Sequence, residues 1–245
     1  MSQEMPGSVP PLSAETTKNP LERIIGVLFS PKATFEDINR RPDWLVPTIL
    51  IVLVALATTY VFLSHVDMLE LVKAQIEKSG RPVPADEALQ PSLKWTPIIS
   101  YVSVLIFVPV SLLLISGILL MVFSFMLGAE TTYRKIFCAN AYASMTSLVK
   151  SIIAIPILFV KQPTEFGNPA DIVQSNLGIL IDPSNKGLHA LGKSVDLFTL
   201  WYLFVLAIGI VGVSKNLVFK KALMTIIILW AIVTAGVVGW AAFVK

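Results

Sequence analysis

Lys150 is the residue whose chemistry most needs an explanation, because it lies inside an apolar stretch that runs from Cys138 to Val160. A lysine in the hydrocarbon of a bilayer costs at least about 2.5 kcal/mol unless it reaches the interface or is paired. Asp196, at the start of a later apolar stretch, and Asp67 are the acidic residues within reach of its long stem. We therefore expect Lys150 to clamp two helices together or to extend toward the outer membrane surface.

A polar binding site is the alternative interpretation of the same lysine. Ser147 and Ser151 belong to a stripe of small polar residues on the same helix, beside Lys150. In this hypothesis Lys150, Ser147, Ser151 and Asp196 line a small cavity in the membrane that binds an anionic group or a lipid headgroup. A water-filled cavity that reaches Lys150 near the membrane centre would favour this site over a clamp.

The sequence argues against catalysis and against a metal centre. It contains no HExxH zinc motif, paired-aspartate motif, GxSxG elbow or phosphate-binding loop. The serines beside Lys150 could form a dyad with it, but no oxyanion donor accompanies them. One cysteine, Cys138, excludes an intramolecular disulfide and a thiolate zinc site, and two histidines are too few for most metal centres. We expect no enzyme activity, no cofactor and no metal.

The composition identifies the elements that must position these residues as membrane helices. Hydrophobic residues make up 55% of the chain and charged residues 14%, and the mean hydropathy is +0.75. The apolar runs are about 20 residues long without alternation, which is the length of a membrane-crossing helix and unlike a β-barrel strand. The basic residues are scattered through short loops, so we expect no nucleic acid partner.

The predicted fold is an all-α polytopic membrane protein with five transmembrane helices and amphipathic interfacial helices at its N-terminus. Residues 46–245 form one five-helix membrane domain. Its spans are predicted at about 46–64, 97–127, 138–160, 194–213 and 222–244. Prolines at 82, 84 and 91 predict an extended segment ahead of the second span.

The N-terminal region divides into a predicted disordered tail, 1–18, and a cytoplasmic amphipathic segment, 19–45. Asn19 with Pro20, and Ser30 with Pro31, each read as a helix cap followed by proline in the first turn. The segment and the first short turn provide a candidate interface for membrane lipids or for another membrane or cytoplasmic protein. Its residues are Phe35, Arg40, Arg41, Trp44, Tyr133 and Arg134. A solvated amphipathic helix is the simpler interpretation.

Charge sets the expected orientation. The turns 128–137 and 214–221 carry an excess of basic residues, whereas basic and acidic residues nearly cancel in the two longer loops. The positive-inside rule therefore places these turns and the N-terminus in the cytoplasm, and the C-terminus outside. Cys138 should then react with a thiol reagent only from the cytoplasmic side.

Three stretches resemble the Yip domain family, the Ypt-interacting proteins, in its bacterial form. They contain a Pro-x-x-Thr-Phe start within SPKATFEDINRRPDWLVP (30–47), a Gly-x-x-x-x-Tyr-Arg turn within LGAETTYRKIFCANAYAS (127–144), and an Asp-x-Phe-x-x-Trp start within VDLFTLWYLFVLAIGI (195–210), which SKNLVFKKA (214–222) follows. The resemblance covers about residues 20–243. It implies a five-span helical domain with a cytoplasmic N-terminus in the bacterial cytoplasmic membrane.

The chain also departs from the family pattern. Ala129 stands where members often have a second glycine, and Met145 and Thr146 stand where a proline is common. Eukaryotic members are associated with small GTPases and vesicle traffic, but their Asp-Leu-Tyr-Gly-Pro element is absent here, so a GTPase partner is not supported.

The function expected from the sequence is that of a non-catalytic membrane scaffold or adaptor of the Yip domain type, in membrane organisation or trafficking. The alternative is a small transporter or permease component that uses the polar site around Lys150.

Overall fold

The computed structural model describes residues 18–78, 80–160 and 172–243, so all but the last residue of the predicted tail lies outside it. The described part contains helices joined by short connections, and its only β-type pairs are two isolated bridges. In chain order the helices are α1 (Pro20–Phe29), α2 (Pro31–Arg40), α3 (Leu45–His65), α4 (Met68–Lys78), α5 (Asp86–Leu120), the π-helix η1 (Met121–Met126), α6 (Tyr133–Ala143), α7 (Met145–Val160), the 3₁₀ helix η4 (Leu177–Leu180), α8 (Lys186–Ser194), α9 (Leu197–Gly212) and α10 (Phe219–Phe243).

The all-α membrane fold predicted from the sequence is confirmed. Within the described residues, four helices are long and apolar enough to cross a bilayer: Leu45–His65, Asp86–Met126, Tyr133–Val160 and Phe219–Ala241. The remaining predicted span, the fourth at 194–213, corresponds to α9, which is apolar but has 16 residues, a length of about 24 Å. The 3₁₀ helix η4 and helix α8 precede α9 in the chain. They pack on each other, and α8 packs on α10.

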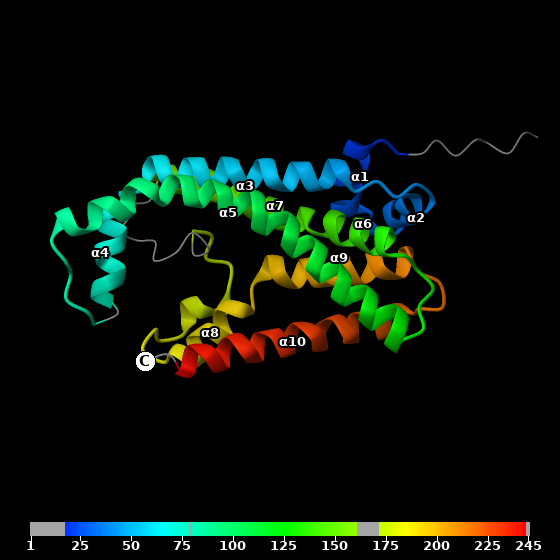
Figure 1. The fold of residues 1–245 in the computed structure, drawn as a ribbon. Helices are drawn as coiled ribbons and strands as arrows, with labels where there is room; N and C mark the ends of the chain where they lie inside the picture. Colours follow the sequence, from blue (N-terminus) through cyan, green and yellow to red (C-terminus); the bar gives the residue numbers. More distant parts are fainter. Residues whose placement is uncertain (1–17, 79, 161–171, 244–245) are drawn as a thin grey trace, which may run out of the picture.

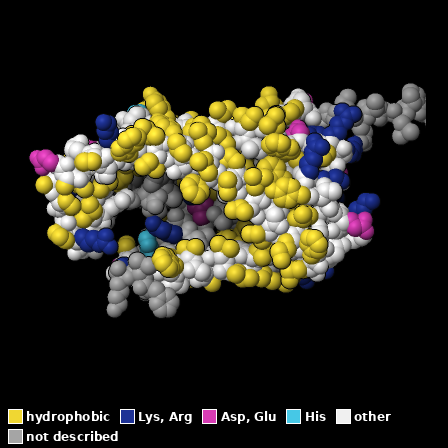
Figure 2. Space-filling view, viewed as in Figure 1, with side chains coloured by type: hydrophobic (Ala, Val, Ile, Leu, Met, Phe, Trp, Pro, Cys, Tyr) yellow, Lys and Arg dark blue, Asp and Glu magenta, His cyan; other side chains and the backbone are white. Residues whose placement is uncertain are grey.

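The membrane helices form two layers, with α3 and α7 in one and α9 and α10 in the other, and α5 runs obliquely from the first toward the second (Figure 1). α1 and α2 lie at one end of the molecule and α4 and α8 at the other, and the chain ends at the side opposite to α1 (Figure 1). Hydrophobic side chains cover most of the visible face along the helices, while Lys and Arg gather at the α1 and α2 end (Figure 2). This distribution fits a lipid-facing belt with a basic end.

The two short basic turns are joined at the α1 and α2 end. Glu130 and Lys215 exchange backbone hydrogen bonds of 3.3 and 3.0 Å, and the Asn216 amide donates to the Glu130 carboxylate at 2.8 Å. Thr131 donates to the carbonyl of Val213 at 2.9 Å. Both turns therefore lie on the same side of the membrane, as the topology predicted from the sequence requires.

The prediction of an extended segment before the second span is wrong for its second half. There, α5 begins at Asp86 and runs through Pro91 and Pro97. Prolines remove helical hydrogen bonds, but this part of α5 is exposed, so water can satisfy the freed carbonyls. An ion pair of 2.8 Å between Lys73 and Asp86 also ties its first turn to α4.

The predicted third span is a helix with a one-residue interruption at Ser144. α6 begins at Tyr133, earlier than expected, and the chain turns at Ser144 before α7 begins. Ser144 donates both its backbone N–H, at 3.0 Å, and its hydroxyl, at 2.9 Å, to the carbonyl of Asn140, and such hydroxyl bonds often bend helices.

Candidate functional site

An ordered platform at the basic end is formed by α1, α2, the segment 41–44 and the first turn of α6, and its centre is Arg23. Nε of Arg23 lies 2.8 Å from Oδ2 of Asp37, and one terminal nitrogen lies 2.9 Å from Oδ2 of Asp43. The same nitrogen donates to the carbonyl of Arg41 at 2.9 Å. Only 3% of Arg23 is exposed, so a short surface helix is held to the bundle by a buried charge with three acceptors.

The platform is also bonded to α6. Tyr142, which is fully buried, donates its hydroxyl to Oδ1 of Asp43 at 2.6 Å. Arg134 donates to the carbonyl of Pro42 at 2.8 Å. α1, α2 and the segment that leads into α3 are thus held in one arrangement on the membrane helices.

The electrostatics of this network favour charged Arg23. Burial of the guanidinium lowers its pKa, but the hydrogen bond and charge of Asp37, with the charge of Asp43, outweigh that effect and raise the pKa above its ordinary value. Arg23 therefore keeps its charge at any physiological pH. The role of this charge is positional, because the guanidinium faces protein acceptors.

The structure corrects the prediction that Phe35 belongs to the candidate interface. The structure buries it completely, and Gly209 and Gly212 of α9 allow its close approach. A Cβ on either glycine would come within 2.9 or 2.7 Å of the Phe35 side chain. The amphipathic period of α2 is correct, but its apolar face is covered by α9, so Phe35 anchors the platform and is not available at its surface.

The other predicted interface residues lie on the platform surface. Arg40, Arg41 and Arg134 are exposed. Trp44 is 41% exposed and Tyr133 38% exposed, and both rings contact Phe137, with centroid distances of 5.7 and 6.2 Å. The platform therefore presents arginines beside partly exposed aromatic rings.

Asp196 and Asp67 are the two predicted partners of Lys150, and the structure pairs it with Asp196. Its Nζ lies 2.9 Å from Oδ2 of Asp196, whose side chain is 6% exposed. The hydroxyl of Ser175 donates to the same oxygen, and Oδ1 accepts from the backbone N–H groups of Phe198 and Thr199 at 3.0 and 3.2 Å. Asp196 is thus both the N-cap of α9 and the counter-ion of Lys150. Sequence reasoning missed Ser175, which lies in an irregular loop.

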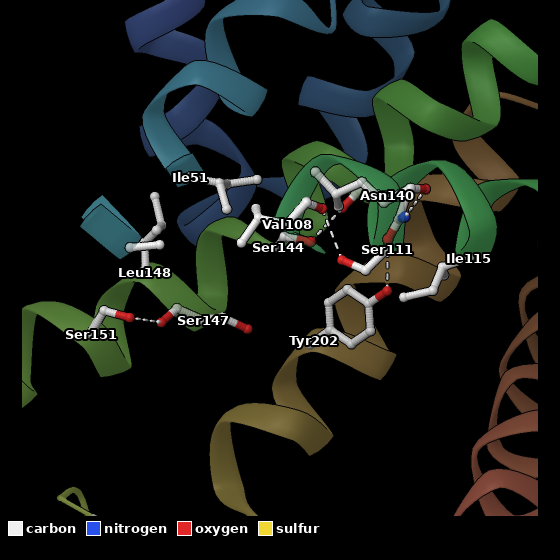
Figure 3. Close-up of a pocket in the computed structure, with 12 residues that line it drawn as sticks. Ile51, Val108, Ser111, Ile115, Asn140, Ser144, Ser147, Leu148, Ser151 and Tyr202 are labelled. Atoms are coloured by element: carbon white, nitrogen blue, oxygen red, sulfur yellow. Dashed lines mark hydrogen bonds between the residues drawn. The ribbon is translucent and has the colours of Figure 1, made fainter. Parts of the chain in front are cut away.

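Ser147 and Ser151 lie in a different place from this ion pair. They line a cavity of about 320 Å³ that is walled mainly by α3, α5 and α7, together with Asn140 and Ser144 and with Tyr202 of α9 (Figure 3). Neither Lys150 nor Asp196 lines it. The single polar site predicted from the sequence is therefore divided in two, because residues adjacent in α7 point in different directions.

Asn140, Tyr202 and Ser151 of the cavity wall are hydrogen-bonded within the protein. The Asn140 amide donates to the Ser116 hydroxyl at 3.0 Å and accepts from the Tyr202 hydroxyl at 2.7 Å, and Ser151 donates to the carbonyl of Ser147 at 3.3 Å. A second cavity of about 570 Å³ between α3, α4 and α5 also contains Ser151 in its wall. These features suit packing of polar helices or binding of a small molecule. The described residues contain no group of acidic, His and Cys side chains arranged to hold a metal ion.

Comparison with known proteins gives a match to one family model. The model of the Yip1 domain matches residues 25–241, which is nearly the whole chain. No curated protein and no solved structure gives a significant match.

Proposed function

The chain belongs to the Yip1 domain family, and from this premise we propose that it is a non-catalytic membrane scaffold or adaptor that acts through its basic platform. In this proposal it serves membrane organisation or trafficking in a bacterial cytoplasmic membrane. The platform faces the cytoplasm and the C-terminus lies outside. Its partners are membrane lipids and another membrane or cytoplasmic protein, and a GTPase is not proposed.

The buried Arg23 network is the observation that carries this proposal. Burying a charged group is costly, and its best-attested benefit is to fix one arrangement of the chain. Here the network fixes two amphipathic helices that contribute nothing to crossing the membrane. A rigid platform with exposed arginines and aromatic rings has the composition of an interaction surface, in which Arg, Tyr and Trp are enriched.

The proposed orientation follows from the two joined turns. They contain Arg134, Lys135, Lys215, Lys220 and Lys221, against Glu130 as their acidic residue. Because the turns pair with each other at the platform end, their charges act on the same membrane side, and a basic excess favours the cytoplasm.

A transporter or permease component is the second candidate. The two cavities that share Ala55 and Ser151 support it, since their walls carry several hydroxyl groups within the apolar layers. The ion pair between Lys150 and Asp196 weighs against it, because this lysine lies outside both cavity walls and is bound to a carboxylate.

Crosslinking in native membranes tests the adaptor role. The full-length protein is compared with a platform variant, Tyr133→Ala/Arg40→Gln, and with a control in the opposite end, Leu69→Ala/Arg81→Gln. The proposal expects a defined partner that is captured by the wild type and the control but lost from the platform variant. Equal capture by all three proteins would show that the platform is not the interaction surface.

A further inference from the structure

The platform contains an open cavity among its basic side chains. It has a volume of about 470 Å³ and is lined by Lys18, Arg23, Arg41, Pro42, Asp43 and Arg134. A cavity of this size falls in the ordinary range for ligand sites, about 300–1,000 Å³. Its wall has four cationic side chains and one carboxylate.

The carboxylate in the cavity is already engaged. Asp43 accepts from Arg23 at 2.9 Å and from the Tyr142 hydroxyl at 2.6 Å, while Asp37 holds the other side of Arg23. Arg23, Asp37 and Asp43 together carry one net negative charge, because one guanidinium faces two carboxylates. Lys18, Arg41 and Arg134 add three positive charges, so the cavity as a whole favours an anion.

The cationic side chains come from separate elements and converge on the cavity. Lys18 precedes α1 and donates to the Thr34 hydroxyl at 3.1 Å, Arg41 follows α2, and Arg134 is in the first turn of α6. Arg134 bonds to the carbonyl of Pro42 at 2.8 Å, which aligns its planar guanidinium beside the cavity. Guanidinium groups bind phosphate oxygens in this forked manner.

The depth of the cavity identifies the source of the anion. Asp43 stands just before the membrane helix α3, which begins at Leu45, and Arg134 is in the first turn of the span that begins at Tyr133. Spans end where hydrocarbon meets headgroups, and the exposed Trp44 beside the cavity is typical of that level. Basic groups at this position bind anionic lipids of the cytoplasmic leaflet.

We propose that this cavity binds the phosphate of an anionic phospholipid headgroup, with Lys18 and Arg134 as ligands. The inference rests on the proposed function only for the assignment of the platform to the cytoplasmic leaflet. The bound lipid would join the start of α1 to the starts of α3 and α6, and so support the platform from the membrane side.

Native mass spectrometry of the delipidated full-length protein in detergent tests this site. The probes are phosphatidylglycerol, phosphatidylcholine and inorganic phosphate, each added alone. The cavity variant is Lys18→Gln/Arg134→Gln, with Arg134→Gln alone as a milder change. The matched control is Lys220→Gln/Lys221→Gln, which removes the same charge from two exposed positions in the other turn.

The wild type and the control should retain phosphatidylglycerol in preference to phosphatidylcholine. The cavity variant should bind it more weakly by roughly tenfold or more, because it loses the charge-assisted hydrogen bonds of two ligands to the phosphate. Equal weakening of the cavity variant and the control would overturn the site in favour of general surface attraction. Binding of inorganic phosphate as strong as that of the lipid would overturn the lipid assignment. This readout needs no protein partner, so its failure is distinct from failure of the adaptor role.

Discussion

Replacement of Arg23 by methionine should loosen the platform strongly. The change removes bonds of 2.8 and 2.9 Å to Asp37 and Asp43 and one of 2.9 Å to a backbone carbonyl, and it leaves Asp37 buried without its counter-ion. Breaking one side of a buried ion pair costs about 3–5 kcal/mol. The double variant Arg23→Met/Asp37→Asn removes the stranded charge, so it should recover about 1–3 kcal/mol of that loss.

The assay is unfolding in detergent micelles, with limited proteolysis to detect release of α1 and α2. Lys32→Met is the matched control, because Lys32 is exposed on α2, and its effect should stay within about 0.5 kcal/mol. If Arg23→Met unfolds and is digested like the control, the network does not hold the platform. If the double variant is less stable than the single one, the cost of a stranded charge is the wrong explanation.

Further variants test other contacts. Asp196→Ala should destabilise more than Lys150→Met, by about 1 kcal/mol in detergent unfolding, because the aspartate also caps α9; equal losses would reduce its role to the ion pair. Gly209→Ala should cost about 1–3 kcal/mol, since its Cβ would lie 2.9 Å from a buried ring, whereas Gly236→Ala meets nothing within 4 Å and should be neutral or slightly stabilising in the same assay. Cys138 is fully buried, so a thiol reagent should label it only after denaturation; labelling of the native protein from either side would contradict its packing.

The membrane helices could be predicted from the sequence because hydrophobic length directly reflects bilayer thickness. The first span was predicted at 46–64 and is helical over Leu45–His65. The interruption at Ser144 could not be predicted in this way, because it lies inside the hydrophobic run and does not change the length of that run.

The candidate sites show the same limit. The pairing of Lys150 with Asp196 was predictable, because few acidic residues lie near the apolar stretches. The Arg23 network was not, since its acceptors come from α2 and from the segment before α3, and nothing in the spacing marks Arg23 as buried. Phe35 was assigned to the surface because the sequence alone does not show that glycines of α9 receive its ring. Labelling of Cys138 cannot report the orientation, because this thiol is buried within the protein.

The adaptor role and the lipid site both require the platform to face the cytoplasm. Single introduced cysteines measure this orientation most directly. Lys215→Cys lies in the joined turns at the platform end, and Ser184→Cys lies near the opposite end, both at exposed positions. With the buried Cys138 left in place, a membrane-impermeant maleimide added to intact cells should label the cysteine at 184, and should label the one at 215 only after the membrane is opened. Labelling at 215 in intact cells, with protection at 184, would contradict a cytoplasmic platform.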